Sequence, residues 1–378
     1  MTITINNKNK KTNVPNLRFP EFQGEWNLSK ISDVLSIGNG RDYKNLAKGD
    51  IPVFGTGGYM TSVSDYLYDG ETAFIGRKGT INKPYFYKGK FWTVDTLFYT
   101  HSFNGVTPHF VYCLFQTINW LRYNEASGVP SLSKDTIEKI KVHIPQIEEQ
   151  QKISLLLFLL DERIATQSKI IEDLKKLKSA IIDYAINSLH CDFVKFGTLY
   201  EMAGEGGTPA TSNAAYYDNG NIPFIKIDDL KQKYLIEHKD FITELGLKKS
   251  SAWLIPTNAI LYSNGATIGE ISITTYPVCT KQGILGIVPK PIIDVEFLYY
   301  FMSSTYFRKA VSRIVTEGTM KTAYLKDINN ILCPIPTKEK QQEIAKMPSA
   351  LNSKIDFEQS ILKLFCSQKQ HLLRQMFI

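Results

Sequence analysis

Hydrophobic side chains recur at alternating steps of four and three residues in two long stretches, which is typical of helices that pair with another helix. The first stretch follows Pro145 and the second follows Pro336. Each begins directly after an Ile-Pro pair, and proline suits the start of a helix. The pattern predicts a central long helix over residues 147–190 and a C-terminal long helix over residues 337–378, each about 60 Å long if fully helical.

The residues expected to join the two helices occur at the same places in both stretches. Polar residues interrupt the apolar series at Gln167 and Lys178, and again 191 positions later at Glu358 and Lys369. Two series in the same phase favour an antiparallel coiled coil with pseudo-two-fold symmetry over two helices that each pack on their own domain. The predicted pairing residues are Leu160, Ile164, Ile171, Leu174, Ile181, Leu351, Ile355, Leu362, Phe365 and Leu372.

Met347-Pro348 lies inside the second stretch. Proline removes a backbone hydrogen bond and obstructs the preceding turn. We therefore expect the stable part of the C-terminal helix to begin near Ser349.

The chain also repeats itself between the helices, at offsets that increase along the sequence. The increase, from 165 (residue 30 against 195) to 191 (residue 144 against 335), indicates a duplication with insertions in the second copy. The matching segments are KISDVLSIGNG with KFGTLYEMAGEGG, DIPVF with NIPFI, FVYCLF with FLYYFM, and IPQIEEQQKI with IPTKEKQQEI. We predict a mixed α/β (α+β) fold with an N-terminal tail (1–18), one globular domain over 19–146 before the central helix and a second over 191–336 before the C-terminal helix.

Composition limits the number of domains, the class of partner and the cellular compartment to be expected. The 378 residues suit more than one domain, and 44 Lys and Arg against 37 Asp and Glu give a net charge of +7, which suits a polyanionic partner. Five scattered cysteines without a C-x-x-C pair indicate neither a disulfide framework nor a zinc ribbon. No apolar leader or membrane-length segment is visible, so we expect a soluble cytoplasmic protein.

Catalytic signatures are missing from the sequence. The P-loop and H-E-x-x-H patterns are absent, and SIGNG (36–40) lacks the third glycine of a dinucleotide loop. NKPY (82–85) departs from the N-P-P-Y of adenine methyltransferases at Lys83, and Asp229-Leu230-Lys231 has no Pro-Asp partner of a nuclease site. We expect no catalytic residue, metal or cofactor in this chain.

Loops rich in Gly, Lys, Arg, Asn and Thr are the predicted DNA-binding sites. Glycine lets the backbone approach phosphate, cations neutralise it, and Arg, Lys and Asn hydrogen-bond base edges. The two copies differ most in these loops, which suggests two unlike half-sequences. The predicted contacts are Arg41, Tyr43, Lys44, Asn45, Tyr59, Arg77, Lys78, Thr80, Asn82 and Lys83 in the first copy, and Lys226, Asp228, Lys231, Ser263, Asn264, Thr267, Lys281, Thr319 and Lys321 in the second.

The opening NVPNLRFPEFQGEW (13–26), the two Ile-Pro-x-x-E-x-Q-x-I junctions and the duplicated plan resemble the specificity subunit of type I restriction-modification enzymes over nearly the whole chain. The resemblance implies two target-recognition domains, each reading half of a split double-stranded DNA site, with the helices setting the spacer. It also implies two modification subunits that bring S-adenosylmethionine, and restriction subunits that bring ATP-driven translocation and cleavage, with Mg likewise bound by the partners.

Two other interpretations stay open from the sequence. One is a stand-alone DNA methyltransferase or nuclease, which would bind S-adenosylmethionine by itself. The other is a coiled-coil adaptor, which would bind protein in a salt-insensitive way and show no affinity for duplex DNA.

Overall fold

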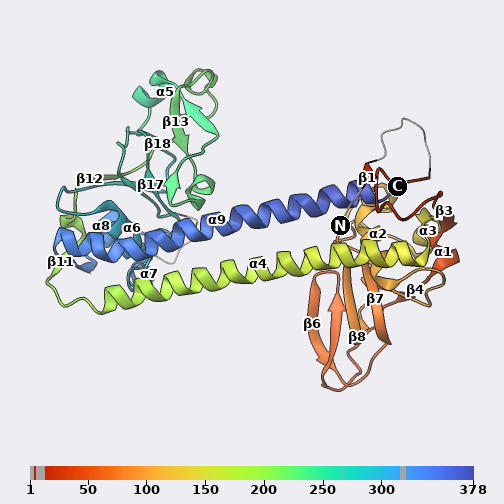
Figure 1. The fold of residues 1–378 in the computed structure, drawn as a ribbon. Coiled ribbons are helices and arrows are strands. Elements are labelled where there is room, and N and C mark those ends of the chain that lie inside the picture. Colours follow the sequence, from red (N-terminus) through yellow and green to blue (C-terminus); the bar gives the residue numbers. More distant parts are fainter. Residues whose placement is uncertain (1–3, 6–12, 266, 316–320) are drawn as a thin grey trace. The chain divides into compact units, whose positions relative to one another are not determined.

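The computed structural model describes residues 4–5, 13–265, 267–315 and 321–378. It divides into two compact units, one made of residues 1–168 with 360–378 and the other of residues 169–359. Each unit contains one α/β domain together with a part of each long helix (Figure 1).

The first unit is built on a six-stranded sheet in the order β4-β9-β7-β8-β5-β6. Its neighbours are antiparallel except β5 and β8, which run parallel. A short antiparallel pair, β3 with β10, closes the domain before the central helix, and β1 pairs with β2. The strands are β1 (Thr4–Ile5), β2 (Leu17–Arg18), β3 (Asn27–Lys30), β4 (Ser36–Asn39), β5 (Ile51–Gly55), β6 (Gly58–Val63), β7 (Tyr68–Gly76), β8 (Tyr85–Thr93), β9 (Leu97–His101) and β10 (Lys141–Ile144).

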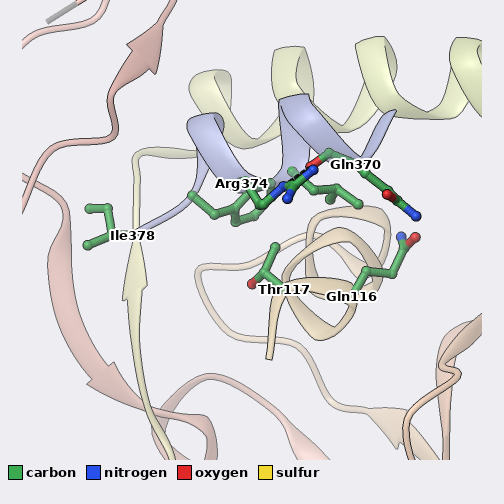
Figure 2. A pocket seen from close by; sticks show the side chains of 7 residues that line it. Gln116, Thr117, Gln370, Arg374 and Ile378 are labelled. Atoms are coloured by element: carbon green, nitrogen blue, oxygen red, sulfur yellow. Dashed lines mark hydrogen bonds between the residues drawn. The ribbon is translucent and has the colours of Figure 1, made fainter. Parts of the chain in front are cut away.

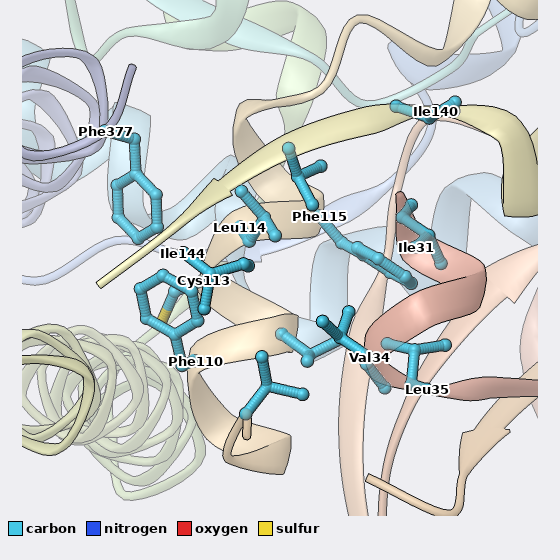
Figure 3. Close-up of a cluster of buried hydrophobic side chains, with 14 of the residues drawn as sticks. Ile31, Val34, Leu35, Phe110, Cys113, Leu114, Phe115, Ile140, Ile144 and Phe377 are labelled. Carbon is cyan, nitrogen blue, oxygen red and sulfur yellow. The ribbon is translucent and has the colours of Figure 1, made fainter. Parts of the chain in front are cut away.

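One helix, α2 (Pro108–Thr117), packs against β7 and β8 of this sheet, and its side chains join a core that includes residues of both long helices. Its buried face includes Phe110, Cys113 and Leu114. Figure 3 shows these side chains gathered with residues of α1 (Ile31–Val34) and β10 and with Phe377, whose ring is stacked 5.4 Å from that of Phe110. The remaining helices of the domain are η1 (Trp120–Tyr123) and α3 (Lys134–Lys139).

The second unit repeats this plan with a different sheet arrangement. A five-stranded sheet has the order β12-β19-β16-β17-β14, and a three-stranded sheet has the order β15-β13-β18. The pair β11 with β20 corresponds to β3 with β10. The strands are β11 (Phe193–Lys195), β12 (Tyr200–Glu205), β13 (Ile222–Ile225), β14 (Tyr234–Leu235), β15 (Asp240–Ile242), β16 (Ile260–Ser263), β17 (Ile271–Thr274), β18 (Cys279–Thr280), β19 (Ile284–Pro289) and β20 (Leu332–Pro334).

Helix α6 (Val295–Ser303) takes the place of α2 in the second unit. Both follow a capping side chain, Thr107 before α2 and Asp294 before α6. Side chains of α6 join a core that includes Ile182 and Ile186 of the central helix. The other helices of the domain are η2 (Phe196–Thr198), η3 (Ala214–Tyr216), η4 (Ile227–Lys231), α5 (Glu244–Lys248), α7 (Thr305–Ile314) and α8 (Leu325–Ile328).

The two long helices are α4 (Ile147–Asn187) and α9 (Lys338–Met376). In the first unit Asp161 of α4 contacts Lys369 of α9, and Arg163 lies over the ring of Phe365. Position numbers rise on α4 as they fall on α9, so the helices pack antiparallel there. In the second unit Lys178 of α4 contacts Asn352 of α9. Among the described helices, none combines the length and apolar character that a membrane span requires.

The expectation that α9 begins near Ser349 is wrong. The helix runs from Lys338 through Pro348 without a break. Its first turns are held by tertiary packing, since Ala345 is buried in the core of the second domain and Ile344 packs against that core. This packing compensates for the backbone hydrogen bond that proline removes.

One buried glutamine in each copy makes hydrogen bonds that hold the repeated Ile-Pro junction. Gln150 donates from Nε2 to the carbonyls of Pro145 (2.9 Å) and Gly105 (2.8 Å), and its Oε1 accepts from the Thr107 amide (2.9 Å). Gln341 makes the same three bonds, to Pro336, Ile292 and the Asp294 amide. Each glutamine therefore ties the start of a long helix to the loop that enters α2 or α6.

The seam residues predicted from the heptads lie at different depths. Leu160, Ile171, Ile355 and Leu372 are buried, and the other six are half-buried. The pattern missed the residues that attach the last turn of each helix to a domain, which are Ile182 and Ile186 on α4 and, 191 positions later, Leu373 and Phe377.

Candidate nucleic-acid interface

In the first unit the loop of residues 77–79 pairs with the loop of residues 130–132, and we call this pair of loops the first ledge. The corresponding pair in the second unit, around Asn264 and Ala323, is the second ledge. The backbone of Arg77 to Gly79 pairs with the 130–132 segment, through Gly79 N to Pro130 O (2.8 Å) and Leu132 N to Arg77 O (2.9 Å). Gly79 has φ +84°, a conformation that glycine adopts without strain. The sequence singled out the first loop as glycine-rich and basic, and the fold adds the second loop to it.

A hollow of about 410 Å³ lies against this ledge. Three cationic side chains, Arg77, Lys78 and Lys134, line it together with one carboxylate, Glu125. The guanidinium of Arg77 lies 5.9 Å from the centre of the Phe98 ring, and it donates to the Asp95 carbonyl (3.3 Å). These contacts hold the cation at the rim, where phosphate oxygens would be suitable partners.

Glu125 is used inside the chain. It accepts hydrogen bonds from the Thr136 hydroxyl and from the Ser133 hydroxyl (2.7 Å) and amide (3.2 Å). These bonds, that of Thr136 first, lower the pKa of the Glu125 carboxyl. Because Glu125 is hydrogen-bonded to residues at the start of α3, it positions Lys134, the first residue of α3, beside the ledge.

Arg41 lies near the same edge of the sheet. Its backbone amide donates to Thr93 O (2.8 Å), and its carbonyl accepts from the Trp92 indole (2.9 Å). Burial raises the pKa of Tyr99, an effect that the charge of Arg41 opposes. Arg41 itself is exposed, so its cation is available to an anionic partner.

The other predicted residues of the first copy differ in exposure. Tyr43 is half-buried against the small core around Val53 and Trp92, and Thr80 is half-buried. Tyr59, at the tip of the β5–β6 hairpin, is 64% exposed. The remaining residues are exposed, namely Lys44, Asn45, Asn82 and Lys83.

The second unit builds the same loop pair from different residues. Ala323, which is 191 positions after Leu132, donates its amide to Asn264 O (2.9 Å). The Asn264 side chain is buried and donates to the Ala323 carbonyl (3.2 Å). Ser263 is also buried and accepts from the Glu270 amide (2.8 Å). These two predicted residues therefore hold the loop together, while Thr267 is exposed. Thr319 lies outside the described residues.

A hollow of about 300 Å³ is lined by Gly269, whose amide donates to the Ser263 carbonyl (3.0 Å), and by Lys321, two residues before Ala323. Lys321, a predicted contact, lines it together with Arg308 of α7 and Ser312. The sequence did not single out Arg308, nor Lys134 in the first copy. Each lies on a helix, away from any glycine-rich loop, and only the fold brings it to the ledge.

Two further predicted lysines of the second unit are neighbours in space. Lys226 follows β13 and Lys281 follows β18, and these strands are parallel partners whose carboxyl ends meet. Lys281 donates its amide to Ile225 O (2.9 Å). Lys226 is paired with Asp240 (2.8 Å), and Lys231 is paired with Asp228 (3.2 Å), so a phosphate would compete with these surface ion pairs.

A third hollow, of about 480 Å³, lies at the end of α9 within the first unit. Figure 2 shows Gln116 and Thr117 of α2 facing Gln370 and Arg374 of α9, with Ile378 nearby. None of the residues predicted to touch DNA lines it. Across the described residues there is no group of three or more His, Cys, Asp or Glu placed to hold a metal ion.

Sequence comparison agrees with the duplicated plan. A profile described as the type I restriction modification DNA specificity domain matches residues 23–176 and, a second time, residues 191–364. The chain belongs to the type I restriction-modification DNA specificity family. Each match to the family profile contains one α/β domain and part of a long helix.

Members of the specificity family from one archaeon resemble the chain at low identity. The type I restriction enzyme MjaIX specificity subunit of Methanocaldococcus jannaschii is 24% identical over 67% of this chain, which spans 64% of that protein. The putative type I restriction enzyme MjaX specificity subunit of the same organism is 23% identical over 95% of this chain and 86% of its own length.

Solved structures show the same fold. The S subunit of a type I restriction-modification system from M. genitalium aligns with a TM-score of 0.63 at 15% identity, covering 97% of this chain and 99% of its own. A chain from a structural study of type I complex assembly and conformational transition aligns with a TM-score of 0.57 at 14% identity, covering 93% of this chain. The expected mixed α/β fold, with two similar domains and paired long helices, is confirmed.

Proposed function

We propose that this chain is the non-catalytic DNA specificity subunit of a cytoplasmic type I restriction-modification complex. Each domain reads one half of an asymmetric, bipartite double-stranded DNA target, and the paired helices set the number of unspecified base pairs between the halves. The observation that carries the proposal is the loop pair built once in each domain, around Arg77 and Leu132 and around Asn264 and Ala323, with cations beside it.

Different side chains on the same framework support two unlike half-sequences. The first ledge presents Arg77, Lys78 and Lys134, while the second presents Lys321 and Arg308. Phosphate contacts by these cations would position the duplex, and neighbouring loop residues would contact base edges.

In this proposal, partner subunits supply the catalytic activities. Two modification subunits would dock beside the helices and bind S-adenosylmethionine, and restriction subunits would bind ATP and Mg. This chain would contribute the placement of their target adenines and no reacting group.

Adenine-methylation mapping tests the proposal. Cells would express a cognate modification subunit with or without this chain, and genomic DNA would be sequenced for methylated adenine. We expect a methylated motif of two unlike halves around a fixed gap only when the chain is present. Methylation that does not depend on the chain would contradict the proposal and favour a protein adaptor, whose partner binding would be insensitive to salt. Binding of S-adenosylmethionine by the isolated chain would favour a stand-alone methyltransferase.

A further inference from the structure

The polar interruptions of the helix seam include one lysine in each unit. In the first unit Lys369 of α9 contacts Asp161 of α4, with Nζ 2.5 Å from Oδ1. The lysine side chain is only 13% exposed. Its Nζ lies 5.6 Å from the centre of the Tyr112 ring of α2, so the contact lies where both long helices meet the domain.

The second unit contains the corresponding contact on α4. Lys178 donates from Nζ to Asn352 Oδ1 of α9 (2.8 Å), and Asn352 donates from Nδ2 to Asp356 Oδ2 (3.0 Å). Burial lowers the pKa of the Lys178 ammonium, and the charge of Asp356 opposes that effect. Burial raises the pKa of the Tyr299 hydroxyl of α6, and the neighbouring Tyr300 and Asp356 add to that effect.

These two contacts are repeats of one arrangement. Lys178 and Lys369 are 191 positions apart, and so are Asp161 and Asn352. Tyr112 and Tyr299 both occupy the third position of the repeated segments FVYCLF and FLYYFM.

Asparagine carries no charge, yet the second contact keeps a carboxylate. Asp356 supplies it one turn further along α9 and is joined to the lysine through the Asn352 amide. The corresponding position of the first copy is Ala165. The largely buried Lys369 therefore contacts a carboxylate directly, and the partly buried Lys178 reaches one through Asn352, which suits cations that are removed from solvent.

Other helix registers would lose these direct contacts. A slip of one heptad would place Ser154 or Ser168 where Asp161 now faces Lys369. It would place Ala345 or Gln359 where Asn352 now faces Lys178. Each slip would replace Asp161 by serine, or Asn352 by alanine or glutamine, opposite a lysine that is largely or partly removed from solvent, so the contacts favour the native register. A single buried polar residue in a coiled coil acts in this way.

We propose that Lys178 and Lys369 are positioning residues that fix the axial register of α4 against α9 at each domain, and that they thereby restrict the spacer length the protein accepts. The inference about spacer length rests on the proposed function. The inference about register does not, because it concerns only the helix pair.

The first experiment measures register directly by cross-linking of the full chain. Arg163 lies 5.1 Å from the centre of the Phe365 ring. In a Cys366→Ser background, Arg163→Cys with Phe365→Cys reports the native register, and Arg163→Cys with Glu358→Cys reports a slip of one heptad. Adding Lys178→Leu and Lys369→Leu should lower the native cross-link at least about threefold and raise the slipped one, since the penalty against other registers is removed. Unchanged cross-linking would overturn the proposal.

The second experiment measures spacer discrimination with duplexes that carry the methylated target. The unaltered chain should prefer the native spacer over spacers longer or shorter by one base pair by about tenfold or more, as for a mismatch in a site. Lys178→Leu with Lys369→Leu should reduce that ratio to about threefold or less while both half-sequences stay the same. An undiminished ratio would contradict the proposal.

Matched variants separate register from charge and from folding. Lys175→Leu and Lys363→Leu remove exposed lysines from the same two helices and should change neither readout. Lys178→Arg with Lys369→Arg keeps both cations and should retain the native cross-link. A chain whose cross-links respond as expected, but which shows no affinity for duplex DNA, would refute the proposed function and leave the register inference supported.

Discussion

Glu149 is a fully buried carboxylate in the first turn of α4. It receives two bonds from the Arg18 guanidinium, both 2.7 Å, and one from the Trp26 indole (3.3 Å). Arg18 also donates to the carbonyls of Gly24 (2.6 Å) and Gln23 (3.3 Å). The pair thus attaches the segment before β3 to the central helix. The corresponding position in the second copy is the exposed Lys340, so this attachment belongs to the first unit alone.

Removing one charge of this pair should destabilise the first unit. Arg18→Met leaves Glu149 buried without its counter-ion, and we expect the free energy of unfolding to fall by about 3 kcal/mol or more. Denaturant unfolding monitored by tryptophan fluorescence would measure it, since Trp26 is buried beside the pair. Glu21→Gln is the control, because its ion pair with Lys152 is exposed and should contribute about 1 kcal/mol or less. Equal losses in both variants would contradict the expectation.

The cations of the first ledge should act through phosphate. Replacing Arg77 and Lys78 by alanine should weaken duplex binding for every sequence tested. It should also lower the slope of log affinity against log salt by about one for each phosphate that is no longer neutralised. Titrations at several salt concentrations would measure the slope.

A variant of equal charge change serves as the control for the ledge. Lys175→Ala with Lys176→Ala removes two exposed lysines of α4 and should leave the slope within error. If the ledge variant keeps the slope of the unaltered chain, this loop does not meet phosphate.

Among the elements, the helix junctions show what a repeated motif encodes. Each Gln-Gln pair has one buried and one exposed member, Gln150 before Gln151 and Gln341 before Gln342. Only the buried member bonds to the loop that enters α2 or α6. The repetition of both glutamines is visible in the sequence, but their different roles follow from the turn of the helix that faces the domain.

Gln150→Ala and Gln341→Ala should each destabilise the chain by about 1–3 kcal/mol, because buried backbone groups lose their partners. Gln151→Ala and Gln342→Ala are matched controls that remove the same side chain from a neighbouring exposed position, and we expect changes within about 0.5 kcal/mol. Chemical unfolding of the four variants would decide. Equal effects at buried and exposed positions would show that the junction bonds contribute nothing measurable.

At the scale of the whole molecule, the helices should control spacing and the domains should control sequence. Deleting residues 166–172 from α4 and 358–364 from α9 removes one heptad from each helix between the two lysine contacts. Each deletion shortens its helix by about 10 Å, which corresponds to about three base pairs of duplex. We expect the methylated motif to keep both half-sequences and to change its gap.

Methylation mapping with the shortened chain would measure this change. Exchanging one domain should have the opposite effect on the methylated motif, giving a new half-sequence with the original gap. A shortened chain that methylates different bases at the original gap would contradict the assignment of spacing to the helices.

The repeated plan can be predicted from the sequence, because heptads, duplicated segments and Ile-Pro junctions are local patterns that depend on residue spacing alone. The paired helices are predictable for the same reason, and the composition of their loop indicated Arg77 and Lys78. The prediction of a late helix start near Pro348 was wrong, because the packing of Ala345 and Ile344 keeps the helix intact where proline alone favours a break.

The residues that share a surface or a core are known only from the folded chain. Folding brought Lys134 and Arg308 to the ledges from helices. Ser263 and Asn264, which the loop composition predicted to contact DNA, are buried. Folding also gave the polar interruptions their partners, as Lys369 with Asp161 shows. Asp161 and Lys369 are about 200 residues apart, and Asn264 and Ala323 about 60, and no pattern along the chain specifies which distant positions the closing of the fold will bring together.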